Sequence, residues 1–131
     1  FVLTTEVERR RLLCRVTALE RTVVDALDRP DLTGGLEEAW RSLSAVPLLD
    51  LPRLLDYVRL RSHATLAAKV GLFLERHQKQ FGVKPSLLDE LRGLRPRQPH
   101  YLDRSAGGRL VRSWNLIVPP AILEGEWEAV R

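Results

Sequence analysis

The sequence predicts an α+β fold, in which a compact bundle of about five helices packs against a small sheet formed by N- and C-terminal strands. Amphipathic helical periodicity fills the middle of the chain, and short runs rich in β-branched residues stand near both ends. The length of 131 residues is that of one ordinary domain, which is large enough to bury a core. We therefore expect residues 1–131 to form a single domain.

The first part of the chain combines short strands with a helix. Segments 1–5 and 11–17 have the composition of two strands, which could form a hairpin. A helix follows, because Thr17 is a favourable N-cap and Glu20, three residues later, completes a capping box. Turn-forming residues end this helix at 28–35. Its expected apolar face consists of Leu19, Val23, Val24 and Leu27.

Three further helices are expected, at 35–43, within 46–61 and at 84–96, on the basis of their apolar periodicity. Asp50 is placed to cap the second of these, and Pro52 is tolerable in its first turn. The inward-facing residues of the first two are expected to be Leu36, Trp40, Leu43, Leu51, Leu54, Leu55 and Val58.

A fourth helix is expected at 62–82, with Ser62 as its N-cap. Its apolar stripe consists of Leu66, Val70, Phe73, Leu74 and His77. Gly71 costs about 1 kcal/mol relative to alanine in a helix interior, so we expect a neighbouring element to approach it closely. Glu75 lies four residues before Lys79, which favours an exposed ion pair. The charged groups fan out around the helix, which favours packing over catalysis.

The last third of the chain differs in composition from the helical middle. Residues 96–108 form a turn-rich loop, 109–119 have the content of a strand, and 120–131 close with a helical turn. Strand alternation would place Arg112 and Trp114 on one face, where arginines beside an aromatic ring can bind phosphates and stack on bases. The alternative is a polar strand face behind which the tryptophan is buried.

The basic residues are almost all arginines. Of 21 basic residues only three are lysines, and the formal net charge is +4. Arginine suits the recognition of phosphate and carboxylate. The candidate macromolecule-binding residues are Arg9, Arg10, Arg11, Arg109 and Arg112. The competing explanation is the arginine-rich codon usage of a GC-rich genome, because acidic residues are interspersed through most of the chain.

Signatures of catalysis do not occur in the sequence. The three histidines form no HxH, HxxxH or HExxH spacing, and neither His63 nor His77 has an obvious nucleophile next to it. There is no GxSxG elbow and no phosphate-binding P-loop. We therefore expect no enzymatic activity, no cofactor and no metal. A nuclease or transferase remains an alternative, which requires Asp25, Asp28 and Asp31 to meet in space.

Several features bear on the compartment and the extent of the protein. Cys14 is the only cysteine, which fits a reducing compartment. No apolar run approaches the ~20 residues needed to cross a bilayer, and no signal peptide is visible. We expect a cytoplasmic protein without membrane partners. No methionine occurs, even at position 1, so we expect a longer protein whose missing part precedes Phe1.

Several stretches together resemble one known family. They are "VTALERTVVDALDRPDLTGGLEEAWRSL", "AAKVGLFLERH", "RPRQPHYL", "GRLVRSWNLIVP" and the later "EW". In this order they resemble the C-terminal region of AbiEi-family antitoxins, the antitoxin components of type IV toxin–antitoxin systems, which are often described as transcriptional regulators. The resemblance covers roughly Phe1 to Trp127.

The resemblance implies a non-enzymatic regulatory role. Such proteins carry an N-terminal winged helix-turn-helix that binds operator DNA and represses their own operon. Their C-terminal region counteracts a nucleotidyltransferase-type toxin without requiring a stable complex with it. The family brings no catalytic residues to map onto this chain. Direct binding of nucleic acid by an arginine-rich face is the alternative function.

Overall fold

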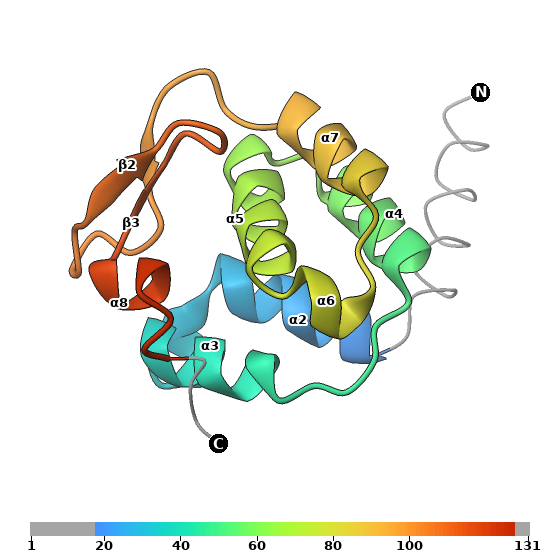
Figure 1. Ribbon diagram of the computed structural model, residues 1–131, viewed down its shortest axis with the longest axis horizontal. Coiled ribbons are helices and arrows are strands. Elements are labelled where there is room, and N and C mark those ends of the chain that lie inside the picture. The colour runs from blue at the N-terminus through green and yellow to red at the C-terminus, as the bar shows by residue number, and fades with distance from the viewer. Residues whose placement is uncertain (1–17, 128–131) are drawn as a thin grey trace.

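The computed structural model describes residues 18–127 (Figure 1). Within this range the fold is α+β, as predicted, with seven α-helices, one 3₁₀ turn and a three-stranded sheet. Some sequence-based predictions lie outside the described residues: the strands at 1–5 and 11–17, the N-cap Thr17, Cys14, and Arg9, Arg10 and Arg11.

The elements follow one another with short connections. The helices are α2 (Ala18–Asp28), the 3₁₀ turn η1 (Pro30–Thr33), α3 (Leu36–Ser44), α4 (Leu51–Arg61), α5 (Ala64–Arg76), α6 (Gln78–Phe81), α7 (Pro85–Gly93) and α8 (Pro120–Leu123). The strands are β1 (His100–Tyr101), β2 (Arg109–Val111) and β3 (Leu116–Val118). The helix expected at 62–82 is divided into α5 and α6, because the backbone of His77 departs from helical geometry, with φ −119° and ψ 30°.

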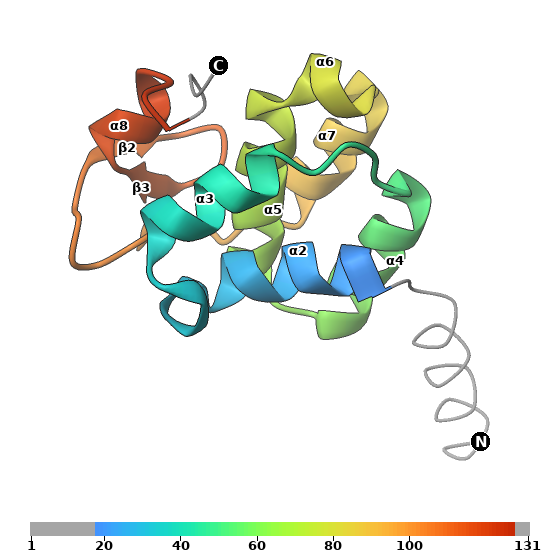
Figure 2. The same ribbon diagram turned by 90° about the horizontal axis from the view of Figure 1, so that it is seen from below.

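Helix α5 lies at the centre of the fold (Figures 1 and 2). It contacts α2, α4, α6, α7 and β3. Its apolar stripe is buried as predicted, and Leu66, Val70, Phe73 and Leu74 are fully inaccessible to solvent. Trp40 of α3 packs edge-on against Phe73, with ring centroids 5.2 Å apart.

The buried stripe of α2 differs by one residue from the prediction. Val23, Val24 and Leu27 are fully buried, but Leu19 is 38% exposed. Glu20 takes the expected place of Leu19, because positions 20, 23, 24 and 27 share one helix face. The Oε2 atom of Glu20 accepts a hydrogen bond from the backbone N–H of Asp50, 2.9 Å away. The carboxylate thereby ties α2 to the start of α4.

The helix caps are partly as predicted. Asp50 caps α4, since its Oδ1 accepts a hydrogen bond from the backbone N–H of Arg53 at 3.2 Å. The cap of α5 is His63, whose Nδ1 accepts from the N–H of Leu66 at 3.1 Å. Ser62, the expected cap, ends α4 instead in a left-handed conformation with φ 50°.

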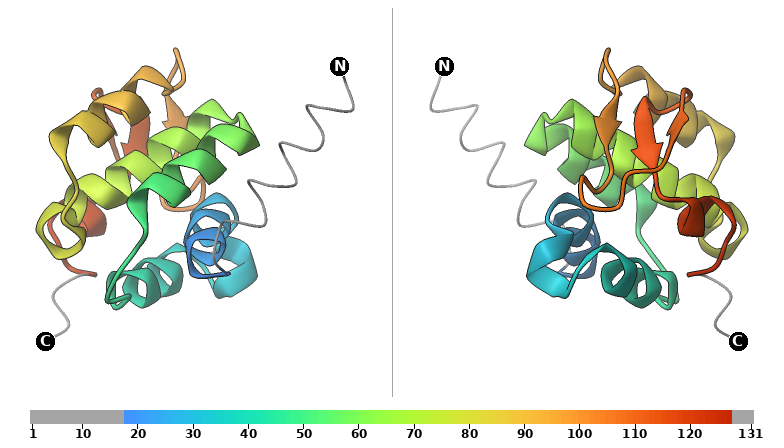
Figure 3. Two further views of the ribbon diagram at one scale, coloured as in Figure 1. Left: turned by 90° about the vertical axis from the view of Figure 1, so that its right-hand side faces the viewer. Right: turned by 90° about the vertical axis from the view of Figure 1, so that its left-hand side faces the viewer.

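The sheet has the strand order β1-β3-β2, with β1 parallel and β2 antiparallel to β3. It lies at one side of the helices and contacts α5 through β3 (Figure 3). The single strand predicted at 109–119 is wrong, because residues 112–115 form a turn and make β2 and β3 a hairpin. Asn115 adopts φ 54° in this turn, a conformation that asparagine tolerates better than most residues. Any contribution of the predicted N-terminal strands lies outside the described residues.

The close approach predicted at Gly71 is confirmed. The neighbour is the indole of Trp114, which lies so near that a Cβ atom at position 71 would overlap its six-membered ring. Trp114 is fully buried, and its Nε1 donates to Oε1 of Glu75 at 2.9 Å. The other oxygen of Glu75 accepts from Arg92 at 2.8 Å. The expected Glu75–Lys79 pair is therefore wrong, since tertiary partners occupy the carboxylate.

Candidate binding surface

Basic side chains are concentrated in and around the sheet. Between residues 95 and 118 the sequence has five arginines and one acidic residue, Asp103. The Oδ1 of Asp103 accepts hydrogen bonds from the backbone N–H and the hydroxyl of Ser105, at 3.0 and 2.7 Å. The five arginines are Arg95, Arg97, Arg104, Arg109 and Arg112. All are exposed, and within residues 18–127 none of them forms an ion pair. This part of the surface has an uncompensated positive charge.

The topology separates these arginines into two groups. Because β1 is parallel and β2 antiparallel to β3, residues before β1 and after β2 lie at one end of the sheet. Arg97 and Arg112 fall at this end, and Arg104 and Arg109 fall at the other. Arg109 and Arg112, which are both candidate binding residues, lie at opposite ends of β2, roughly 10 Å of extended chain apart.

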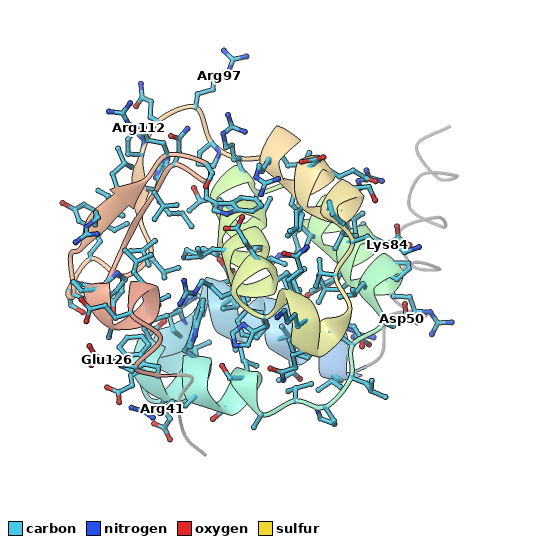
Figure 4. All side chains as sticks on the ribbon, in the orientation of Figure 1. Arg41, Asp50, Lys84, Arg97, Arg112 and Glu126 are labelled. Atoms are coloured by element: carbon cyan, nitrogen blue, oxygen red, sulfur yellow. The ribbon has the colours of Figure 1, made fainter. Side chains whose placement is uncertain are left out.

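The hairpin turn holds Arg97 and Arg112 at the same end of the sheet. The Nδ2 of Asn115 donates to the carbonyl oxygen of Pro96 at 2.7 Å, and the N–H of His100 donates to the carbonyl of Asn115 at 3.0 Å. These bonds fix the turn against the segment that precedes β1. Both arginine side chains extend outward from this end (Figure 4). We call Arg97 and Arg112 the hairpin-end arginines.

Arg112 and Trp114 do not share a face, contrary to the prediction. Arg112 is exposed, whereas Trp114 is fully buried, because strand alternation does not apply within a turn. The guanidinium that contacts the indole belongs to Arg92, whose Cζ lies 5.1 Å from the ring centroid. The alternative of a buried tryptophan is therefore correct, and Trp114 is not accessible to a nucleic-acid base.

A different aromatic residue stands on the outward face of the sheet. Tyr101, Ile117 and Leu110 form one row across the three strands, since Ile117 pairs with both of the others. Tyr101 is 47% exposed and Leu110 40% exposed, whereas Leu116 and Val118 on the opposite face are fully buried. Tyr101 falls in the loop predicted at 96–108, because a strand of two residues has too little alternation to be detected from the sequence.

The structure brings together one serine and one histidine that are 33 residues apart. The Oγ of Ser44 lies 2.8 Å from Nε2 of His77 and donates to the carbonyl of Trp40 at 2.7 Å. The Nδ1 of His77 lies 2.7 Å from the carbonyl of Phe73. The expectation that His77 has no nucleophile beside it is therefore wrong. Ser44 is 6% and His77 5% exposed, and both groups bond the last turns of α3 and α5. The pair joins helix ends rather than facing a substrate.

The three aspartates of the nuclease hypothesis are held by arginines. Arg61 donates to Asp25 at 2.8 Å and to Asp28 at 2.6 Å. Arg29 pairs with Asp31 at 3.4 Å. In the part of the chain that the structure describes, no group of three or more His, Cys, Asp or Glu side chains is arranged to hold a metal ion. Asp25 and Asp28 thus link α2 to α4 through Arg61, whereas the Arg29–Asp31 pair is local.

Comparisons with protein-family models, with curated proteins and with solved structures find no match to this chain. None of the helices between residues 18 and 127 has the length and apolar character needed to span a membrane.

Proposed function

We propose that the chain is the C-terminal domain of an AbiEi-like antitoxin and transcriptional regulator. It counteracts a nucleotidyltransferase-type toxin in the cytoplasm and has no catalytic activity of its own. A DNA-binding domain N-terminal to this chain represses the operon. The proposal rests on the family resemblance described above, and the following observations support it.

The observation that carries the proposal is the contact between two of the resembling stretches. Gly71 and Glu75 belong to "AAKVGLFLERH", and both contact Trp114 of "GRLVRSWNLIVP". Two of the resembling stretches, which are far apart in the sequence, therefore pack against each other where the sheet meets α5.

The hairpin-end arginines provide a surface for a macromolecular partner. They are exposed and are free of ion pairs within the described residues. Arg112 lies in a turn that is hydrogen-bonded to Pro96, the residue before Arg97. Exposed guanidinium groups suit carboxylate or phosphate groups on a partner, because each group presents a planar set of donors.

A growth-rescue assay tests the antitoxin proposal. The chain is co-expressed with a nucleotidyltransferase encoded in the neighbouring reading frame, and we expect it to restore growth. The double variant Arg97→Glu/Arg112→Glu should abolish rescue without changing the melting temperature. Lys79→Glu/Lys84→Glu reverses the same amount of charge on α6 and before α7, and should rescue fully. Failure of the wild-type chain to rescue, or the lack of such a neighbouring gene, would count against the proposal.

Direct binding of nucleic acid is the second candidate function. The five exposed arginines against one acidic residue between 95 and 118 favour it. Phosphate contacts make the logarithm of the affinity for duplex DNA fall with the logarithm of salt concentration, by about 0.9 per contact. Titration of the chain with duplex DNA and with RNA at two salt concentrations measures this slope. No binding at low salt would dispose of this candidate.

A further inference from the structure

Two hollows flank the edge strand β1, and both are lined by Tyr101 and Arg104. Each has a volume of about 570 Å³, within the range of about 300–1,000 Å³ typical of sites for small ligands. One hollow extends to Thr65 and His100, and the other extends to Lys69 of α5. Tyr101 and Arg104, both exposed, are therefore shared by the two depressions, which we together call the β1 groove.

Lys69 is a cation whose donors are unused. It is half-buried and forms no hydrogen bond within residues 18–127. Burial lowers the pKa of Lys69, although the negative charges of Asp28 and Asp103 act in the opposite direction. A partly desolvated ammonium group without an acceptor is unfavourable. An anion in the adjacent hollow would supply the missing acceptor.

The acidic residues of the β1 groove already have partners inside the protein. Asp28 bonds Arg61, Asp31 bonds Arg29, and Asp103 bonds the N–H and hydroxyl of Ser105. Arg104 has no ion pair in the described part of the chain. Lys69 and Arg104 are therefore the cations of this wall that remain available to a ligand.

We propose that the β1 groove binds a nucleoside phosphate, with the base stacked on Tyr101 and the phosphate held by Arg104 and Lys69. The ligand is either a free nucleotide or the terminal nucleotide of a single strand, since both present the same base and phosphate. Stacking accepts any base, because every base has a π-face. Arg104 lies at the end of the sheet opposite the hairpin-end arginines, and the site is independent of the antitoxin proposal.

Isothermal titration calorimetry of the whole 131-residue chain at low salt tests the site. The probes are AMP, adenosine, inorganic phosphate and a five-nucleotide oligoadenylate. AMP should bind about tenfold more tightly than either adenosine or phosphate, because only AMP engages the ring and the cations together. An oligoadenylate that binds like AMP identifies a free nucleotide as the ligand, and one that binds much more tightly identifies a strand end.

Four variants locate the binding. Tyr101→Ala should weaken AMP binding about tenfold, whereas Tyr101→Phe should keep it within about twofold, because the stacking surface is retained. Lys69→Met and Arg104→Glu should each weaken it by about tenfold. The controls are Leu110→Ala, a similarly exposed residue of the same sheet face, and Lys79→Glu on α6. Both controls should bind as the wild type does.

Any of three results would overturn the proposal. The first is the lack of saturable binding of both AMP and the oligoadenylate by the wild-type chain. The second is an affinity for inorganic phosphate equal to that for AMP, and the third is AMP binding that Tyr101→Ala leaves unchanged. Because Tyr101 is exposed, its replacement is not expected to unfold the chain, and a melting curve for each variant verifies this.

Discussion

Replacing Gly71 by alanine places a methyl group where the Trp114 indole already lies. The new Cβ would overlap the six-membered ring, with Cε3 at 2.9 Å and two further ring atoms closer still. The indole has no room to retreat, since it is fully buried and Arg92 lies over its ring, 5.1 Å from the centroid. Relief of the overlap requires the indole to move, and that movement breaks its hydrogen bond to Glu75.

The expected cost combines three effects. Overpacking of a well-packed core destabilises by about 1–3 kcal/mol. Loss of a hydrogen bond to a charged acceptor costs about 1.5–3 kcal/mol. The higher helix propensity of alanine offsets about 1 kcal/mol of this loss. We therefore expect Gly71→Ala to lower the free energy of unfolding by about 1.5–5 kcal/mol.

Urea denaturation followed by circular dichroism measures this change. Gly93→Ala, near the end of α7, is the matched control, because a Cβ there meets no atom within 4 Å. The control should be as stable as the wild type or up to about 1 kcal/mol more stable. Combining Gly71→Ala with Trp114→Leu should cost less than the sum of the two single changes, since the smaller side chain leaves room for the methyl group. A Gly71→Ala variant as stable as the wild type would refute the packing argument.

Three further predictions concern other polar groups. Burial lowers the pKa of Lys69, so the charged side chain destabilises the folded chain at pH 7. This cost disappears as the pH rises past the ordinary lysine pKa of about 10.4. Lys69→Met should therefore raise the melting temperature at pH 7 and raise it less at pH 11, and equal increases at the two pH values would exclude the charge as the cause. Asn115→Ala should lower the free energy of unfolding by about 2–3 kcal/mol in urea denaturation, through backbone strain and loss of the hydrogen bond to Pro96. Asn115→Gly should lower it less, and a glycine variant less stable than the alanine variant would contradict the role of the left-handed turn. Ser44→Ala should lower the free energy of unfolding by about 1–3 kcal/mol in the same assay, because it removes a buried hydrogen-bond partner of His77. A decrease of less than about 0.5 kcal/mol would show that the Ser44–His77 pair does not stabilise the fold.

Sequence reasoning succeeded where the signal is local and periodic. The stripe of α5 follows from helical spacing alone, and the Asp50 cap follows from residue type and position. Gly71 was informative because glycine is costly inside a helix unless a neighbour needs the space. The neighbour itself, Trp114, lies 43 positions further along and could not be named from spacing.

The errors arose where tertiary contacts or a turn overrode a local pattern. Glu75 has a helical neighbour in Lys79, but Arg92 and Trp114 offer it better-shielded partners. The hairpin turn at 112–115 contains neither glycine nor proline, so the segment resembled one long strand. Asn115 was the available sign of a left-handed position.

The candidate sites were the hardest features to predict, because their parts converge from distant segments. Arg97 and Arg112 lie at the same end of the sheet only because of the hairpin and the parallel pairing of β1 with β3. Lys69 lies on α5 and Tyr101 on β1, and the helices α6 and α7 lie between them in the sequence. No spacing rule links such residues, since the link is the topology itself.

The shortness of β1 has a consequence for association between molecules. An edge strand offers unpaired N–H and C=O groups on which a strand of another chain can add, which is a common route to aggregation. β1 has two residues and follows Pro99, which has no N–H to donate. An incoming strand would find too few partners along this edge to form a ladder. The chain can therefore leave the β1 edge uncovered without exposing a template for fibril growth.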